Sequence, residues 1–383
     1  MSFSRYARPW IPTLVFVAVV LCLLLFINYN SGSPYDLEEE KPSWLSSLKM
    51  KRKPDSLPGL HWRDALPWEV APKRFLPNYY TYKELLEKND DVIYRRSNIV
   101  FMHIPRSGGT TMNTCFYKIA QNVKDFDKTV RFVTERNYFS AQKELDGHGE
   151  TDKTVISGEF AFGSCDYLKD RPCAYVLLMR DPYERVISSY SFCKEYNDDD
   201  SDFHCSVRTD DLSVADFAVL EGSPMFRQIV AHPSACGEKF GNYFDFKNMI
   251  NVPKGAVKNN KYPCWMKLKA FLDHKLTPDQ TDELIEYVAN NIERWFASVG
   301  ILDKKNTFLY HLQDMFYIPT HNICSLLHKS NNTVPASQRE LMLQQLKADP
   351  RVAKAMKADL TLYARVKEVV ELQIKAHHII HKK

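Results

Sequence analysis

The chain has 383 residues, of which 44% are hydrophobic and 13% aromatic. This composition allows a sizeable packed core and excludes wholesale disorder. The formal net charge is only +4, so the overall charge does not indicate a nucleic-acid-binding protein, and affinity for acidic partners must come from local groups of basic residues.

An uncharged apolar run, WIPTLVFVAVVLCLLLFI, occupies residues 10–27. A helix of this length nearly crosses a hydrocarbon core of about 30 Å. Arg5 and Arg8 precede the run and acidic residues follow it, so the positive-inside rule places residues 1–9 in the cytosol. A cleaved signal peptide is the alternative, but its apolar region is usually only about 7–15 residues long. We therefore predict a type II transmembrane anchor with the rest of the chain in the lumen.

Residues 28–92 mix proline, charged residues and scattered aromatic residues without sustained periodicity, which is typical of a linker. We predict that this segment is a luminal stem and that residues 93–383 form one catalytic domain. In a luminal chain, the Asn-x-Thr sequon at Asn331 is a usable glycosylation site.

The chain contains nine cysteines, and all except Cys22 lie beyond the apolar run. Because the secretory pathway is oxidising, these residues can form disulfides. Two pairs each bracket a short polar loop, so we expect Cys165 to pair with Cys173 and Cys193 to pair with Cys205. Buried free thiols are the alternative interpretation.

The first candidate site follows a short apolar run at residues 99–103. The order of strand, small-residue loop and helix is that of a cradle for phosphate-like anions. Glycines let the backbone approach an anion, hydroxyls and the N–H groups of the helix can donate to it, and an arginine adds a permanent charge. The residues of this loop are Arg106, Ser107, Gly108, Gly109, Thr110 and Thr111.

Taken alone, this loop has a plainer interpretation, because a glycine pair before a helix is often only a tight turn. It is not a Walker A loop, which requires a lysine directly after the last glycine. The loop therefore argues against a nucleoside-triphosphate kinase or ATPase.

The second candidate site follows a continuous apolar run, residues 174–179, that is typical of a buried parallel strand. Arg180 stands at its end, where ligands of parallel sheets bind, and Asp181 can cap the helix that follows. Arg185 and Ser188 are three residues apart and would share a face of that helix. We expect the two arginines and the serine to converge; the alternative is a capped helix with surface arginines.

Together, Arg-Ser-Gly-Gly-Thr-Thr at 106–111 and Arg-Asp-Pro-x-x-Arg-x-x-Ser at 180–188 resemble the two PAPS-binding motifs of the sulfotransferases. Among these, the chain resembles the membrane-bound glycosaminoglycan enzymes, such as the heparan sulfate and uronyl 2-O- and 6-O-sulfotransferases. The resemblance is good over about residues 97–200 and looser to about residue 345. It implies an α/β, three-layer, P-loop-like fold with a central parallel sheet flanked by helices, in addition to the N-terminal transmembrane helix.

The resemblance also implies roles for the two motifs. Residues 106–111 would hold the 5′-phosphosulfate of PAPS, and Arg180 and Ser188 would hold its 3′-phosphate. The family usually has a lysine where Arg106 stands. Arginine keeps the positive charge but changes its shape and hydrogen bonding. We therefore predict that Arg106 is catalytic and stabilises the charge on the departing phosphate.

Transfer to a hydroxyl also needs a base that removes the hydroxyl proton. Glu159 is our first choice, because it ends the strand-like part of residues 154–162, at the edge where active sites of parallel sheets lie. A surface or salt-bridged glutamate is the alternative. His148 is the second candidate base, since histidine titrates near neutral pH, whereas we expect His103 to be a packed histidine beside the loop. The cysteines and histidines lack zinc-site spacing, so no metal is expected.

These features predict a PAPS-dependent O-sulfotransferase of the Golgi membrane that modifies a glycan, in particular a glycosaminoglycan, by in-line displacement. Basic residues in 247–269 could bind an acidic glycan, although a solvated surface is the plainer interpretation. A tyrosylprotein sulfotransferase and an inactive, membrane-anchored glycan-binding relative are the alternatives. No nucleic-acid partner is expected.

Overall fold

The computed structural model describes only part of the chain, all of it beyond the predicted anchor. The described residues are 61–66, 68–82, 91–134, 137–146, 152–168, 171–195, 205, 209, 212–231, 264–327 and 334–381. Within these ranges, no helix is both long enough and apolar enough to span a membrane. The predicted anchor, residues 10–27, the sequon at Asn331 and the candidate base His148 lie outside the described residues.

The core of the fold is a five-stranded sheet with the strand order β2-β3-β1-β4-β5. Every neighbouring pair of strands is parallel. The central strand β1 pairs with β3 on one side, where Val100 is opposite Ile156, and with β4 on the other, where Val100 is opposite Tyr175. The strands are β1 (Asn98–Met102), β2 (Phe126–Phe132), β3 (Lys153–Gly158), β4 (Cys173–Met179) and β5 (Phe296–Ile301).

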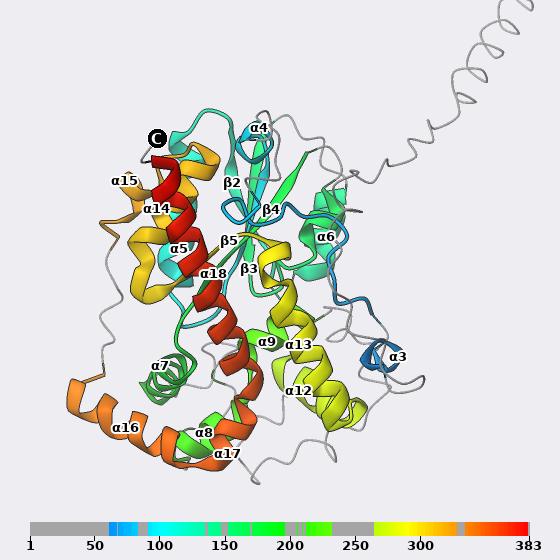
Figure 1. The fold of residues 1–383 in the computed structure, drawn as a ribbon, viewed down its shortest axis with the longest axis vertical. Helices are drawn as coiled ribbons and strands as arrows, with labels where there is room; N and C mark the ends of the chain where they lie inside the picture. Colours follow the sequence, from blue (N-terminus) through cyan, green and yellow to red (C-terminus); the bar gives the residue numbers. More distant parts are fainter. Residues whose placement is uncertain are drawn as a thin grey trace, which may run out of the picture. The chain divides into compact units, whose positions relative to one another are not determined.

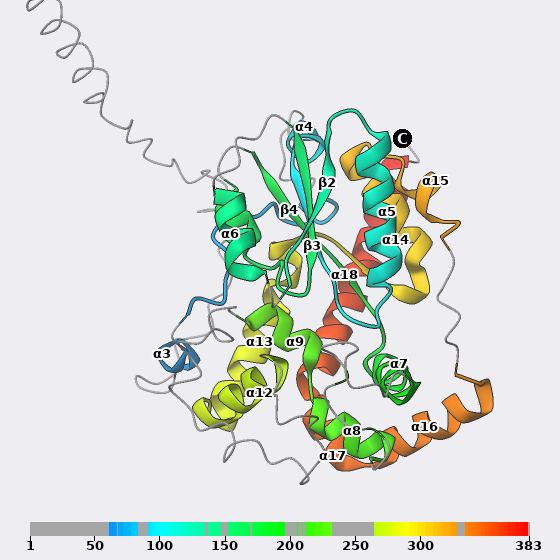
Figure 2. The same ribbon diagram turned by 180° about the vertical axis from the view of Figure 1, so that it is seen from behind.

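Helices connect the strands and cover both faces of the sheet (Figures 1 and 2). They are α3 (Trp62–Ala65), α4 (Asp91–Arg95), α5 (Gly109–Asn122), α6 (Tyr138–Asp146), the 3₁₀ turn η2 (Ser164–Tyr167), α7 (Pro182–Glu195), α8 (Val214–Glu221), α9 (Pro224–Val230), α12 (Cys264–Lys275), α13 (Pro278–Trp295), the 3₁₀ turn η6 (Leu302–Lys304), α14 (Lys305–Phe316), α15 (Thr320–Cys324), α16 (Ala336–Ala348), α17 (Pro350–Ala355) and α18 (Lys357–His381).

Alternate residues of the central strands belong to two different core clusters, because successive side chains of a strand point to opposite faces. Val100 and Met102 pack in the cluster that contains α13 and α18, which lie in front of the sheet in Figure 1. Ile99 and Phe101 pack in the cluster that contains α5 and α14, which lie in front in Figure 2. Both faces of β1 and β4 are therefore buried. The predicted α/β fold, a parallel sheet flanked by helices, is confirmed.

The free edge of β5 is covered by a side-chain amide rather than by another strand. Gln373 of α18 accepts a hydrogen bond from the Val299 N–H at 3.0 Å and donates one to the Val299 carbonyl at 2.7 Å. The Asn78 amide donates to the same Gln373 oxygen at 2.7 Å. The Tyr79 N–H also donates to the Ala297 carbonyl at 2.9 Å, so these edge groups are satisfied and are not open to pairing with another chain.

Part of the segment that was predicted as stem packs against the domain. Trp62 and Leu66 are buried in one core cluster, and Tyr79 and Tyr80 are buried in the other. The carboxylate of Asp166 accepts hydrogen bonds from the N–H groups of Lys73 at 2.9 Å and Arg74 at 2.8 Å. Residues 61–66 and 68–82 therefore belong structurally to the catalytic domain.

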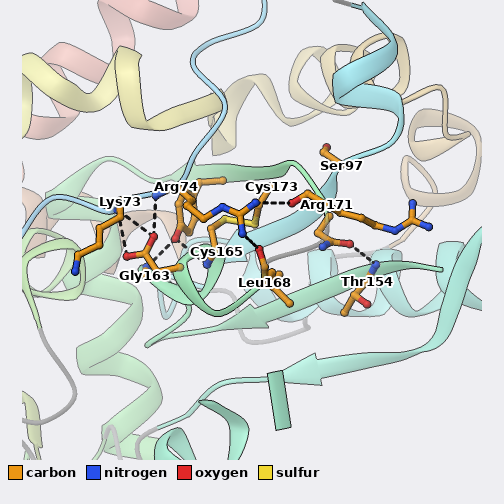
Figure 3. The surroundings of a disulfide bond; sticks show 12 residues. Lys73, Arg74, Ser97, Thr154, Gly163, Cys165, Leu168, Arg171 and Cys173 are labelled. Atoms are coloured by element: carbon orange, nitrogen blue, oxygen red, sulfur yellow. Dashed lines mark hydrogen bonds between the residues drawn. A yellow bond between two sulfur atoms is a disulfide. The ribbon is translucent and has the colours of Figure 1, made fainter. Parts of the chain in front are cut away.

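Both expected disulfides form, Cys165 with Cys173 (Figure 3) and Cys193 with Cys205. A third, between Cys115 of α5 and Cys324 of α15, joins residues 209 positions apart and was not predicted. Disulfides persist in oxidising compartments and are rare in the cytosol. The domain is therefore that of a secretory-pathway protein.

Candidate active site

The two predicted motifs follow neighbouring strands. The loop after β1 leads into α5, and Arg180 and Asp181 connect β4 to α7. The connection after β1 leads to β2 at one edge of the sheet, whereas the connection after β4 leads to β5 at the opposite edge. This reversal is a topological switch point, and ligands of open parallel sheets bind in the crevice outside the carboxyl ends of such strands. In both overall views, α7 lies beyond the lower end of the sheet (Figures 1 and 2).

The two motifs are in direct contact. The Nε–H of Arg106 donates to Oγ of Ser188 at 3.2 Å. Nη1 of Arg180 donates to the carbonyl oxygen of Arg106 at 3.3 Å. Phe192, which has no predicted role, places its ring 4.4 Å from the Arg106 guanidinium carbon. Ser188 and Phe192 are one turn apart on α7, so the spacing could have indicated that they share a face.

The glycines of the loop are required by its backbone and by its neighbours. Gly108 has a φ of 84° and precedes the first turn of α5, and a Cβ there would lie 2.8 Å from Cδ1 of Leu302. A Cβ on Gly109 would lie 1.7 Å from the ring of His103. Arg106 has a φ of 64°, which is uncommon for residues other than glycine and occurs often at ligand sites.

Ser107 is suited to an anionic ligand because its hydroxyl is buried and has no hydrogen-bond partner within the described parts of the chain. The residue is only 1% exposed. An unsatisfied buried hydroxyl costs about 1–3 kcal/mol, which an oxygen of a bound ligand would offset. Thr110 and Thr111 lie in the first turn of α5, where the N–H groups of a helix have no intrahelical partner. The loop therefore fits a phosphosulfate group.

Arg180 lies in a partly buried group of charges. Its Nη2 is 3.5 Å from Oε2 of Glu184, one turn into α7. Burial lowers the pKa of the Arg180 guanidinium, and the charge of Glu184 partly opposes this. Asp181 caps α7 as predicted, since its Oδ1 accepts the N–H groups of Tyr183 at 3.0 Å and Glu184 at 3.2 Å.

Glu159 lies at the same carboxyl end of the sheet, just after the strand beside β1. It directly follows Gly158, the last residue of β3, which is opposite Met102. The His103 N–H donates to the Gly158 carbonyl at 3.0 Å. Through the backbone, Glu159 therefore adjoins the start of the loop that contains residues 106–111. Its side chain is half-buried. This position suits a base, although the role of Glu159 stays a prediction.

His103 is a packed histidine beside the loop, as expected. Its ring lies against Gly109, and its Nδ1 is 3.4 Å from Nδ2 of Asn113. The hydroxyl of Ser157 donates to Oδ1 of Asn113 at 2.5 Å. This chain of polar side chains links β3 to α5 and to the loop between β1 and α5.

A family model described as the sulfotransferase family matches residues 90–316, which include both motifs and Glu159. The chain belongs to the sulfotransferase family. A comparison with curated proteins finds no significant match to this sulfotransferase. Its family implies transfer of a sulfuryl group with PAPS as the donor. Membership of the family does not identify a glycosaminoglycan as the acceptor.

Arg185 of the sulfotransferase pairs with Glu221 rather than with Ser188, so the expectation that it joins Arg180 and Ser188 in one group is not met. Its guanidinium is buried and pairs with Glu221 of α8, from Nη1 to Oε1 at 3.1 Å and from Nη2 to Oε2 at 2.5 Å. Burial works against its charge, but Glu221 raises the pKa of Arg185 overall. The acidic partner lies 36 residues away in the sequence, so the residue pattern of α7 could not predict this pair.

The same buried network continues to α9 and α18. Arg227 of α9 also lies close to Glu221, and burial lowers the pKa of Arg227 to about 10. Burial raises the pKa of Asp359 in α18 to about 6, and its carboxylate accepts the Phe226 N–H at 2.8 Å. Because the network connects α7, α8, α9 and α18, it holds the helix that presents Ser188.

We expect Glu221→Ala to lower the free energy of unfolding by about 3–5 kcal/mol, because it leaves Arg185 buried without its partner. Urea unfolding followed by circular dichroism measures this loss. The matched control is Asp282→Ala, which removes one partner of the exposed Lys357–Asp282 pair and should cost less than about 1 kcal/mol. Equal losses for the two variants would contradict a structural role for the buried network.

The described residues include no group of three or more His, Cys, Asp or Glu side chains that could hold a metal ion. That catalysis requires no metal stays a prediction.

Proposed function

We propose that this sulfotransferase transfers a sulfuryl group from PAPS to a hydroxyl of a glycan, in particular a glycosaminoglycan. The contact between the two motifs carries the proposal, because Arg106 meets both Ser188 and Arg180 at the switch point of the sheet. The resemblance of both motifs to those of the membrane-bound glycosaminoglycan enzymes supports the choice of acceptor, and the disulfides are consistent with a luminal enzyme.

PAPS supplies the activated sulfuryl group and a phosphate leaving group. The orphan hydroxyl of Ser107, the N–H groups at the start of α5 and the Arg106 guanidinium would hold the 5′-phosphosulfate. Arg180 and Ser188 would hold the 3′-phosphate. Arg106 stabilises negative charge on the leaving oxygen, as preorganised donors do in other transfer enzymes. Glu159 accepts the proton of the acceptor hydroxyl.

The test of this proposal uses the full chain in detergent with labelled PAPS and a panel of acceptors. We expect label on heparan or chondroitin chains, and disaccharide analysis then gives the modified position. Label on a tyrosine peptide alone would identify a tyrosylprotein sulfotransferase. Donor binding without transfer to any acceptor would identify an inactive glycan-binding relative.

We further propose that the enzyme is a type II Golgi membrane protein anchored by residues 10–27. The charge difference across this run and the presence of disulfides in the domain support this topology. It predicts that Asn331 carries an N-glycan in cells. Treatment with an N-glycosidase should therefore increase the gel mobility of the wild type but not of Asn331→Gln. A protein that carries no glycan and is digested by protease in sealed microsomes would contradict the topology.

A further inference from the structure

Glu184 places a carboxylate beside the arginine that the proposed function assigns to the 3′-phosphate. It lies in the first turn of α7, its side chain is only 14% exposed, and it is 3.5 Å from Arg180. A phosphate group would have to share Arg180 with this carboxylate. Two negative groups in a partly buried site also repel each other, and water screens the repulsion only weakly. Left uncompensated, Glu184 would weaken donor binding.

A second arginine, Arg339 of α16, holds this carboxylate more closely than Arg180 does. Its Nε is 2.9 Å from Oε1 and 2.7 Å from Oε2 of Glu184, and its Nη2 is 2.6 Å from Oε1. Contacts from one guanidinium to both oxygens of a carboxylate are the strong type of ion pair. The hydrogen bond to Glu184 raises the pKa of Arg339.

Packing keeps Arg339 in position. Met342 and Leu346 of α16 share a buried cluster with Val186 and Ile187 of α7. Arg339 lies about one turn before Met342 on the same helix. The Arg339 side chain is itself about half exposed, at 53%. Its position is therefore fixed by the buried contacts of α16 rather than by burial of the arginine.

We propose that Arg339 neutralises Glu184 and so leaves the charge of Arg180 available to the 3′-phosphate of the donor. Arg339 is then a positioning residue that acts through Glu184, without contact to the nucleotide. This inference rests on the proposed function of Arg180. It also assigns a role in donor affinity to α16, which lies beyond the residues 90–316 that match the family.

The proposal predicts the direction in which nucleotide affinity changes in each variant of a double-mutant cycle. We expect Arg339→Ala to weaken the binding of adenosine 3′,5′-bisphosphate to the full chain by about tenfold, because Arg180 alone then compensates the Glu184 carboxylate and attracts the phosphate less strongly. Glu184→Gln should bind it as tightly as the wild type or more tightly. The double variant should bind within about twofold of Glu184→Gln, since no carboxylate remains to be neutralised. Titration calorimetry in detergent measures all four proteins.

Two comparisons separate this role from a merely structural one. Adenosine 5′-phosphosulfate lacks the 3′-phosphate, so Arg339→Ala should not change its affinity. Arg351→Ala is the matched control, because Arg351 is also an exposed arginine in a close pair, with Asp349 at the N-terminal cap of α17 at 2.6 Å. The Arg351→Ala variant should bind adenosine 3′,5′-bisphosphate as the wild type does. Thermal melts establish that each variant is folded. Arg339→Lys provides a milder variant that keeps the charge.

The possible outcomes are distinct. If the wild type binds neither nucleotide, the proposed function itself is wrong. If the wild type binds but Glu184→Gln fails to rescue Arg339→Ala, Arg339 acts by another route and the inference is overturned. An equal loss of affinity for both nucleotides would also overturn it, because the effect would not depend on the 3′-phosphate.

Discussion

We expect Glu159→Gln to lower the rate constant of sulfuryl transfer by about 10²–10⁴-fold, which is the usual contribution of a positioned general base. Glutamine has nearly the shape of glutamate but does not accept the hydroxyl proton. The affinity for adenosine 3′,5′-bisphosphate should not change, because the residues that we propose hold the donor follow β1 and β4, whereas Glu159 follows β3. Single-turnover rates with labelled PAPS, combined with calorimetry of donor binding, measure the two effects separately.

The control for this experiment is His148→Asn, since His148 is the other candidate base. We expect it to retain most of the transfer rate. If His148→Asn loses the rate and Glu159→Gln keeps it, the base is His148. If both variants bind the donor less tightly, neither residue acts as a base alone, and the assignment of Glu159 is wrong.

The second large effect concerns Arg106. We expect Arg106→Ala to lower kcat by about 10²–10³-fold, which is the typical cost of losing one preorganised charge-stabilising donor. Removing this side chain also removes the hydrogen bond to Ser188 and the contact with Phe192, so the affinity for PAPS should fall as well. Steady-state kcat and KM for PAPS measure both changes.

Arg106→Lys tests whether the charge or its shape matters. Lysine restores the residue usual in the enzymes that this chain resembles, but it cannot reproduce the planar guanidinium that lies over the Phe192 ring. We expect this variant to keep most of kcat. A loss as large as that of Arg106→Ala would show that the geometry of the arginine is essential. A loss of less than about threefold in Arg106→Ala would contradict the catalytic role.

The local sequence was sufficient to predict the elements on which the site is built. Apolar runs of strand length, followed by a glycine pair or by an aspartate cap, predicted β1, β4 and the helices after them. Cys165 and Cys173 are eight residues apart, so their pairing was also a local inference. Such features depend on side-chain periodicity and backbone conformation over a few residues, which the chain carries at each position.

Only the tertiary structure decided which side chains meet. The partner of Arg185 proved to be Glu221 of another helix, and Cys115 pairs with a cysteine 209 positions away. Arg339 reaches Glu184 across 155 residues. No local pattern contains these contacts, because they depend on how helices that are distant in the sequence pack against one another. The sequence by itself determined the two motifs typical of the family and the parallel sheet that positions them, whereas packing determined which charges compensate one another around them.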